Sequence, residues 1–568
     1  MSTSLEVPDS SAGMDEASFH MTVDSTDGPG FSLADTIEYL KVHRRPTIAH
    51  TCVLNSAISE EALNSEYYQL QINEFSAKLQ KSQEMISYYN ALLAPFRLLP
   101  VELVRQIFVD TLPETPTPPN SRHSPLLLCQ VSSEWRAIAL STPALFEYLL
   151  LSGSHPPGFL RETRSINTDA RNVEILDFWI RHAADLPMVL LLGTTYSAIP
   201  PGSLVVEKLI PYLHKLAGLH LSISREEDME SFAYQPGGRM PLLEKLSIFL
   251  PAHKRLTKEI TLFDSAPHLR FVTLRISGPN AFVDLPKMIR LPWAQLSRLR
   301  MPSTPINAAV WVTLIRQCVS LRGGIFLIGT SGDEALPSQP PISLDNLWSL
   351  KVETMPGTPG DVPLYEGLSF PNLKVFSLSY FGYDREFLWS RTPHLFHQLS
   401  RCSLKTLILG RVDIPANELY AILTHSRGLK ALALDISIDL DELLTFLTRS
   451  SPTESPLPEL TDLMLVTRSH FLPANLRNMV ISRGATPDGP TRLGAFFLYA
   501  GDMLLVTHPN FYSTYSTMMT QSAELHMDVP MMYADSTFKL TSFVPEYEEW
   551  DPDLGTFGQQ DQIYARLY

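Results

Sequence analysis

Residues 243–248 read LEKLSI, a pattern in which apolar side chains occupy the first, fourth and sixth positions. The pattern recurs along most of the chain, at Leu216/Leu219/Leu221, Leu243/Leu246/Ile248, Leu269/Val272/Leu274, Leu296/Leu299/Met301, Leu347/Leu350/Val352, Leu373/Phe376/Leu378, Leu404/Leu407/Leu409, Leu429/Leu432/Leu434, Leu460/Leu463/Leu465 and Leu493/Phe496/Leu498. A degraded copy, Leu321/Gly324/Phe326, stands between the copies that begin at 296 and 347. Copies between 216 and 373 lie about 25 to 27 residues apart, and some later spacings reach about 31 to 33.

The fourth and sixth positions of each copy point to the same side of a short strand, into a core. The linking segments carry helical patterns, at 307–318, 416–424 and 440–447. One strand and one helix cannot bury their apolar faces alone, whereas stacked copies build a continuous core and a curved parallel sheet. We therefore predict an α/β chain with an irregular leucine-rich-repeat solenoid over 165–510, with loops at 354–366 and 448–458. The alternative is a set of unrelated α/β strands whose leucines align by chance.

A second informative segment is 95–150, which predicts three short helices. Pro100 suits the first position of a helix, where its missing N–H is no loss. The apolar residues after it recur at helical spacing, at Leu103, Val104, Ile107, Phe108 and Leu112. A second helix is expected after Ser124-Pro125, and a third would be capped by Ser132 or Ser133 with Trp135 turned inward. A unit of this size has a very small core and favours a partner.

The order of residue types in this segment resembles an F-box, the motif that docks onto a Skp-type adaptor in cullin–RING ubiquitin ligases. The matching residues are Pro95, Leu99, Pro100, Glu102, Leu103, Ile107, Phe108, Cys129, Val131, Trp135, Arg136, Ala139, Pro143 and Leu145. The resemblance implies adaptor binding by Pro95, Leu99, Pro100, Leu103, Ile107, Phe108, Cys129, Val131 and Trp135. Phe146 stands where many members carry tryptophan, and 113–124 is a proline-rich insertion. The alternative is a helical hairpin with a buried tryptophan.

The segment after the F-box-like residues adds to this resemblance. A helical pattern at 172–184 precedes a strand that begins at Leu186-Pro187. The same order of a helix and then a strand comes after the F-box in many fungal (mushroom-type) F-box proteins with leucine-rich-repeat-like domains, which this segment resembles.

The two ends of the chain differ from its middle. Residues 1–55 are acidic, rich in small polar residues and poor in large apolar ones, which predicts disorder. Over 59–94 apolar residues fall seven apart, which predicts either an amphipathic helix packed on its own chain or a short coiled coil that self-associates weakly through 68–93. The repeat fades after Leu505, so 511–568 is interpreted as a C-terminal cap or a loose tail.

Composition and motifs exclude several classes of protein. A net charge of −15 argues against non-specific nucleic-acid binding. The four cysteines lie far apart, which fits free thiols in a reducing compartment, cytoplasmic or nuclear, and no zinc site. The first residues lack the features of a signal peptide, and no run reaches the length of a membrane span. Acidic residues crowd at Asp435, Asp439, Asp441 and Glu442, but their spacing matches no ion-binding loop and suits the start of a helix. We expect no metal, no cofactor, no catalytic residue and no enzyme.

The resemblance and the repeats together imply a substrate-receptor subunit of an SCF-type ubiquitin ligase, with an adaptor, a cullin scaffold and an unknown protein substrate as partners. The alternative is a leucine-rich-repeat interaction protein outside any ligase. Side chains that alternate with the buried leucines should face the substrate. In the early copies these are Lys245, Phe249, Phe271, Arg275, Arg298, Arg300 and Lys351, and later copies carry Glu353, Asp435 and Asp462. The early set predicts a basic strip selecting an acidic or phosphorylated segment, unless these are scattered solvated charges.

Overall fold

The structure is a computed structural model of the 568-residue chain, and it describes residues 37–500 with gaps. The longer gaps are at 152–165, 194–203, 223–228, 252–258, 278–284, 330–339, 356–363, 381–386, 450–455, 468–470 and 484–492, with a few shorter ones elsewhere. Most of the predicted disordered segment and the predicted C-terminal cap or tail at 511–568 therefore lie outside the described residues. The chain forms two units, Met1–Pro100 and Val101–Tyr568, which are treated separately.

One long helix dominates the N-terminal unit. Helix α2 spans Ile48–Leu92, and the 3-10 helix η1 lies after it at Pro95–Leu98. The helix begins eleven residues before the predicted start at Ser59, so the prediction of disorder to residue 55 is wrong for its last eight residues. Beyond Pro46 no proline or glycine interrupts the helix, and a composition averaged over 1–55 hides this local preference.

Four short helices open the C-terminal unit, where the sequence predicts three over 95–150. They are α3 (Val101–Asp110), α4 (Leu128–Val131), α5 (Ser133–Leu140) and the 3-10 helix η2 (Pro143–Phe146). The side chain of Ser132 caps α5 by accepting a hydrogen bond from the N–H of Trp135 at 3.1 Å, which decides between the two predicted caps. The rings of Phe108 and Trp135 lie 5.0 Å apart and join α3 to α5.

The rest of this unit is organised by a parallel sheet of thirteen strands whose order is that of the sequence. The strands are β1 (Tyr148–Leu151), β2 (Met188–Leu192), β3 (Leu216–Ser222), β4 (Lys245–Pro251), β5 (Phe271–Ser277), β6 (Arg298–Asn307), β7 (Gly323–Gly329), β9 (Ser349–Thr354), β11 (Val375–Tyr380), β13 (Thr406–Gly410), β15 (Ala431–Asp435), β16 (Asp462–Thr467) and β17 (Ala495–Ala500). Two short parallel pairs lie outside it, β8 (Ile342–Ser343) with β10 (Leu368–Ser369) and β12 (Phe387–Leu388) with β14 (Val412–Asp413). The prediction of an α/β chain with a parallel sheet is confirmed.

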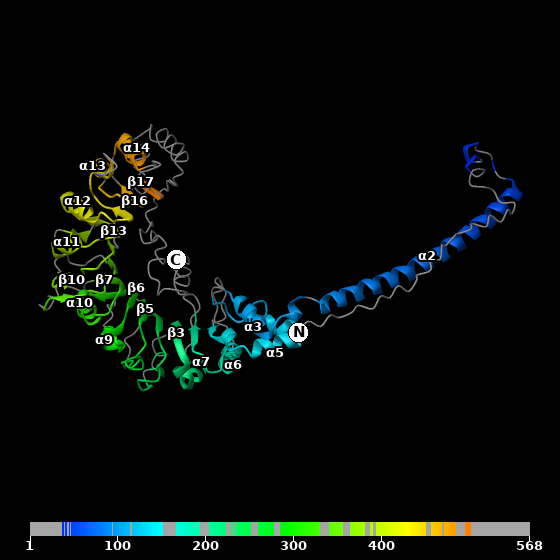
Figure 1. Ribbon diagram of the computed structural model, residues 1–568, viewed down its shortest axis with the longest axis horizontal. Helices are drawn as coiled ribbons and strands as arrows, with labels where there is room; N and C mark the ends of the chain where they lie inside the picture. Colours follow the sequence, from blue (N-terminus) through cyan, green and yellow to red (C-terminus); the bar gives the residue numbers. More distant parts are fainter. Residues whose placement is uncertain are drawn as a thin grey trace, which may run out of the picture. The chain divides into compact units, whose positions relative to one another are not determined.

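Helices connect many of the strands, and Figure 1 shows α10 to α14 along one side of the sheet. They are α6 (Ile166–Ala183), α7 (Leu204–Leu209), α9 (Leu285–Met288), α10 (Ala308–Gln317), α11 (Pro393–Leu399), α12 (Ala416–His425), α13 (Leu440–Leu447) and α14 (Pro473–Ser482), with 3-10 helices η3 (Ile210–Lys215) and η4 (Trp293–Gln295). Helices α10, α12 and α13 match the predictions at 307–318, 416–424 and 440–447. The edge-to-face contact between Trp311 of α10 and Phe326 of β7 identifies the face of the sheet that the helices cover.

The apolar positions of the repeated pattern lie side by side across the sheet. Strand register aligns one buried row, which consists of Leu190, Leu219, Leu246, Val272, Leu299, Gly324, Leu350, Phe376, Leu407, Leu432, Leu463 and Phe496. The residues two positions further along each strand are also buried, from Leu192 on β2 to Leu498 on β17. The sequence therefore located the core positions correctly, including those in the degraded copy.

A ladder of backbone hydrogen bonds runs beside these rows. For each strand of this sheet from β4 to β16, the residue just before the strand donates its N–H to the carbonyl of the equivalent residue in the preceding repeat, at 2.7 to 3.0 Å. The equivalent residues are Ala217, Glu244, Arg270, Ser297, Arg322, Trp348, Lys374, Lys405, Lys430 and Thr461. Because these bonds join backbone atoms, the residue type at the ladder positions can vary.

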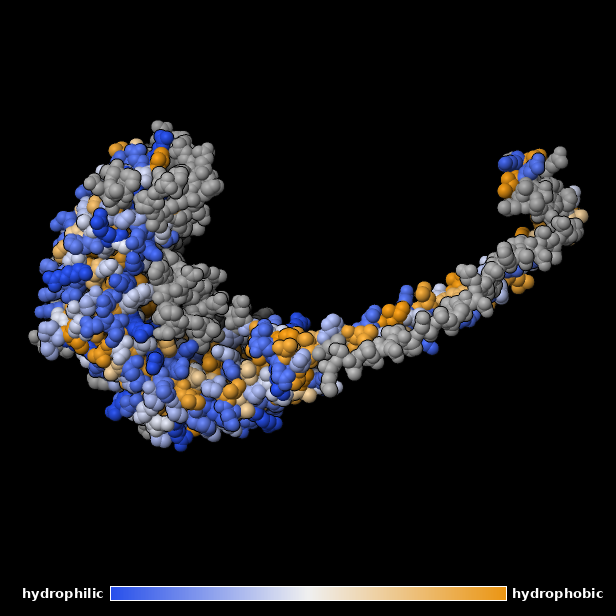
Figure 2. Space-filling model, viewed as in Figure 1, coloured by the Kyte–Doolittle hydropathy of each residue, from blue (hydrophilic) through white to orange (hydrophobic). Residues whose placement is uncertain are grey.

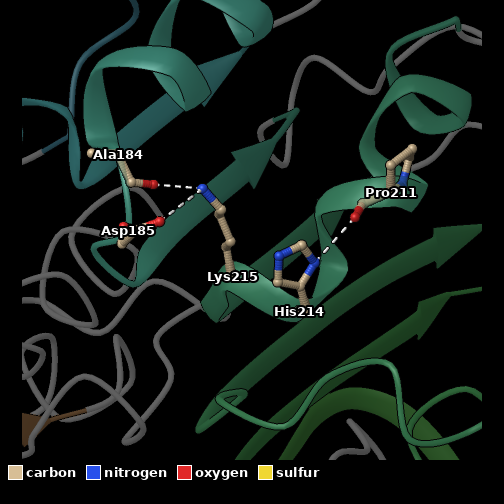
Figure 3. A network of polar contacts seen from close by, with 5 residues as sticks. All are labelled: Ala184, Asp185, Pro211, His214 and Lys215. Atoms are coloured by element: carbon tan, nitrogen blue, oxygen red, sulfur yellow. Dashed lines mark hydrogen bonds and ion pairs between the residues drawn. The ribbon is translucent and has the colours of Figure 1, made fainter.

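Polar contacts join the carboxyl end of α6 to Lys215, the residue just before β3 (Figure 3). Ala184 comes directly after the last residue of α6 with φ at +52°, a left-handed conformation that terminates helices. Its carbonyl accepts a hydrogen bond from Nζ of Lys215 at 2.5 Å, and that ammonium also lies 3.9 Å from the Asp185 carboxylate. A cation at the carboxyl end of a helix satisfies carbonyl groups that have no partner within the helix.

Gly324 shows how the degraded copy still fills the core. A Cβ atom at this position would lie 2.4 Å from Cε2 of Phe326, so the phenylalanine ring occupies the space that a leucine takes in other repeats. The ring is held against Trp311, whose ring in turn contacts Tyr365 at 5.7 Å.

We expect the neighbours Leu242 and Leu243 to respond oppositely to aspartate. Leu243 is fully buried, whereas Leu242 is 40% exposed. Leu243→Asp buries a charge in the core and should lower the free energy of unfolding by more than about 4 kcal/mol, while Leu242→Asp should change it little. Thermal and urea unfolding of both variants measure this. Equal effects would show that the assignment of core positions is wrong.

A second prediction concerns Gly324. Gly324→Ala should destabilise the chain by about 1 to 3 kcal/mol through overpacking against Phe326. Adding Phe326→Leu should recover part of that loss, because the smaller side chain vacates the space. A double-mutant cycle measured by urea unfolding gives the coupling between the two positions, and simple additivity of the two changes would contradict this account.

Candidate binding surfaces

The amphipathic helix α3 presents apolar side chains on both of its faces. Helices α3, α4, α5 and η2 together form what we call the helical unit. Val104 and Phe108 are only 4% and 1% exposed and pack into its core. Leu103 and Ile107 lie on another face of the same helix and are 52% and 39% exposed. Residues four apart on a helix are neighbours, so Leu103 and Ile107 form one exposed apolar pair.

A second exposed pair belongs to the segment that includes α4. Leu127 and Val131 are 42% and 55% exposed and are again four residues apart. Sequence reasoning named Val131 but missed Leu127, although the i, i+4 spacing was visible in the sequence. One pair lies on α3 and the other on the segment that includes α4, and we call the four residues Leu103, Ile107, Leu127 and Val131 the candidate docking surface.

Three residues assigned to the same surface from sequence lie differently. Phe108 is buried, and its ring packs against Trp135. Trp135 and Cys129 are half-buried. Burial raises the pKa of the Cys129 thiol, which keeps it protonated and unreactive at neutral pH. Arg136 donates from Nε to the Cys129 carbonyl at 2.7 Å and ties α5 to α4.

The remaining predicted docking residues lie in the N-terminal unit. Pro95 and Pro100 are exposed, and Leu99 is half-buried. The N–H of Leu99 donates to the Phe96 carbonyl at 3.3 Å, which continues the turn of η1.

On the sheet, three of the predicted substrate-facing residues form one cluster. Register pairs Lys245 on β4 with Phe271 on β5, and Phe271 with Arg298 on β6. The Nζ atom of Lys245 and the guanidinium carbon of Arg298 both lie 5.7 Å from the centre of the Phe271 ring. Both cations are therefore within the distance at which an aromatic ring attracts positive charge. We call Lys245, Phe271 and Arg298 the cation–aromatic cluster.

The other predicted basic residues divide into two groups. Arg275 pairs in register with Phe249 of β4, and Arg300 lies two residues beyond Arg298, so both belong to strands of the cluster. Lys351 lies on β9, separated from β6 by β7, and forms an ion pair with Glu353 at 3.2 Å. The strip predicted from sequence is therefore interrupted at β7, where Gly323 and Ile325 take the equivalent positions.

His220 borders this face on β3. Burial, and to a smaller extent the positive charge of Arg275, lowers the pKa of His220 from 6.5 to about 4. The imidazole is therefore neutral at pH 7, and the positive charge of this face comes from lysine and arginine.

The acidic residues of the later repeats have structural roles. The Asp435 carboxylate lies 3.8 Å from Nε of Arg411, and Asp462 accepts a hydrogen bond from the Thr461 hydroxyl at 2.7 Å. The side chain of Asp439 caps α13 by accepting from the N–H of Asp441 at 2.9 Å, as its position at a helix start suggested.

A shallow depression beside α13 involves some of the same carboxylates and is lined by Tyr420, Asp441, Glu442, Thr445 and Phe446. Asp441 is already engaged, because it accepts hydrogen bonds from the Leu472 N–H at 2.8 Å and from the Asn475 amide at 2.9 Å. Through these two bonds the carboxylate of Asp441 holds α14 against α13. Burial and the nearby carboxylates raise the pKa of Tyr420 in the same depression to about 12.

Two further findings apply to the described part of the chain. No group of three histidine, cysteine or acidic side chains there is arranged to hold a metal ion. No helix there combines the length and apolar character needed to cross a membrane.

Comparison with protein-family models finds no match to this chain, and comparison with curated proteins likewise finds none. The functional interpretation therefore depends on the surfaces described above and on the resemblance of residues 95–146 to an F-box.

Proposed function

We propose that this chain is the substrate-receptor subunit of an SCF-type cullin–RING ubiquitin ligase. The observation that carries the proposal is the candidate docking surface, where two apolar pairs are exposed on a helical unit whose core is only a few side chains. Several large apolar side chains exposed on so small a unit are typical of a site for another protein. They come from the segment whose residues resemble an F-box, which gives the partner as a Skp-type adaptor.

In this proposal the chain contributes no catalytic group. The helical unit anchors it to the adaptor, and the repeat-bearing sheet, interpreted as a leucine-rich-repeat solenoid, holds a protein substrate near the conjugating enzyme of the ligase. The rate of ubiquitin transfer then rises because the lysine of the substrate is held at a high effective concentration.

A second candidate is an interaction protein of the leucine-rich-repeat kind that joins no ligase. The contact of Phe146 with Trp179 of α6, at 5.5 Å between ring centres, favours this candidate. It packs the helical unit against α6, as expected if the helical unit were a cap on the repeat-bearing domain. The two candidates differ in whether the exposed apolar pairs bind an adaptor.

We expect Leu103→Asp with Val131→Asp to weaken capture of a purified Skp-type adaptor by about a hundredfold or more. Both side chains are more than half exposed, so the charges should abolish apolar contact without unfolding the chain. Leu99→Ala with Pro100→Ala should also reduce capture. Leu242→Asp, a comparable change at an exposed leucine elsewhere, is the matched control. Undiminished capture by the double aspartate variant would reject the ligase proposal and favour the second candidate.

We further propose that the cation–aromatic cluster contributes to substrate recognition by binding an acidic or phosphorylated segment. Lys245 and Arg298 supply positive charge on either side of a ring, in a protein whose net charge is −15. Arginine pairs with carboxylate and phosphate through two parallel hydrogen bonds, which favours such groups over neutral ones.

The test of this proposal compares phosphoserine peptides with their unphosphorylated counterparts on the full chain. Lys245→Ala with Arg298→Ala should weaken binding of the phosphorylated peptides about tenfold and flatten its salt dependence. Lys351→Ala should change binding less, because Lys351 lies on β9, beyond β7 and outside the cluster. If the parent does not prefer phosphorylated peptides, or the double variant binds them as the parent does, the cluster does not select them.

A further inference from the structure

Helix α2 exposes apolar side chains along its whole described length. At 1.5 Å per residue its 45 residues extend for about 68 Å. Of its described side chains only Leu54 is half-buried, and the others are exposed. Figure 2 shows apolar side chains, in orange, distributed along this helix. Long helices in water gain most of their stability from packing an apolar face, so α2 requires a surface to cover it.

One face of α2 has the spacing of a coiled-coil seam. Its core positions in heptad order are Leu54, Ile58, Glu61, Ser65, Tyr68, Ile72, Phe75, Leu79, Ser82, Ile86 and Tyr89. Polar pairs within the helix lie outside this seam, as in the ion pair of Lys78 with Glu74 at 2.6 Å and the hydrogen bond from Gln80 to Glu84 at 3.1 Å. These side chains are satisfied within one helix, which leaves the apolar seam to be covered.

Charge along α2 selects the direction of a partner helix. Its first part, from Ile48 to Phe75, carries the four glutamates Glu60, Glu61, Glu66 and Glu74 and neither lysine nor arginine. Its last part carries Lys78 and Lys81 with one acid, Glu84. A parallel pair in register would place acidic halves together and bring Glu61 against its own copy within the seam. An antiparallel pair places the acidic half of each helix beside the half that carries the lysines.

We propose that α2 binds α2 of a second copy of this chain as an antiparallel coiled coil. The seam aligns best with Ile72 of one copy opposite Phe75 of the other. The same register places Leu79 opposite Tyr68, Ile58 opposite Tyr89 and Ser65 opposite Ser82. Glu61 then lies opposite Ile86 near the ends of the paired segments, which keeps the two Glu61 carboxylates apart. It also brings Lys81 level with Glu66 of the second copy.

The first experiment measures the mass of the full chain by analytical ultracentrifugation over a range of concentrations. Ile72→Lys with Leu79→Lys changes the seam, where these residues are 57% and 59% exposed. Leu63→Lys with Leu70→Lys changes the opposite face of the helix, where exposure is similar at 67% and 63%. The seam variant should raise the dissociation constant of the dimer at least about a hundredfold, since each dimer loses four apolar contacts, while the opposite-face variant should leave it unchanged.

The second experiment determines direction by cross-linking in a Cys52→Ser background. Ser65→Cys and Ser82→Cys chains carry different tags and are cross-linked separately and after mixing. The proposed register predicts cross-links between the two tags only after mixing, because Ser65 of one copy meets Ser82 of the other. The Cys52→Ser parent is the control for the remaining cysteines, of which Cys318 and Cys402 are buried.

Each outcome bears on the proposal. A monomer at all concentrations would overturn it, as would equal sensitivity to the seam and opposite-face variants, which would indicate a bundle without a defined seam. Cross-linking of each single variant with itself would establish a parallel pair. A dimer without cross-links after mixing would reject this register.

Discussion

Parallel register between neighbouring strands is the constraint on which the rest of the C-terminal unit depends. Each strand is too short to bury its apolar side chains alone, and it does so only when equivalent positions of adjacent strands meet. A shift of one residue would turn the leucines of that strand to the opposite face. The backbone ladder that runs from Ala217 to Thr461 holds this register independently of side-chain identity. Residues on the face of the sheet opposite the buried leucines can therefore vary in type without loss of register.

Much of the fold could be predicted because periodicity records burial directly. Helices α10, α12 and α13 and the buried rows are predictable from spacing alone, since a core position admits few residue types. Arg483 shows where such reasoning ends. It is fully buried in the structure and donates from Nε to the Leu447 carbonyl at 2.7 Å and from an Nη atom to the Leu457 carbonyl at 3.0 Å. Burial, with the charge of Arg449, lowers the pKa of Arg483 to about 9. Sequence reasoning assigns a lone arginine to the surface, because the carbonyl groups that it satisfies meet only in three dimensions.

The helical unit was predictable in its elements and less so in its surfaces. Its helices and the Ser132 cap are encoded by local signals, which depend on a few neighbouring residues. Which apolar residue faces inward depends on how α3 meets α5, and a motif cannot state that. Phe108, which the resemblance gives as an adaptor-binding residue, is buried, while Leu127 was not named and is exposed. The predicted basic strip shows the same limit: alternation along a strand identified its members, but only register between strands showed that Lys351 lies apart from Lys245 and Arg298.

The connection between the helical unit and the sheet has a consequence for any mechanism that depends on proximity. Phe146, in the last turn of the unit, packs against Phe178 and Trp179 of α6, and the indole N–H of Trp179 donates to the Tyr148 carbonyl of β1 at 3.1 Å. These contacts bridge the unit, the helix and the first strand, so the docking surface is attached to the sheet through packed aromatic side chains. Effective concentration falls when a linker permits many orientations. The packed connection therefore limits the motion of the cation–aromatic cluster relative to the candidate docking surface, which a receptor acting by proximity requires and which a cap on the sheet would equally produce.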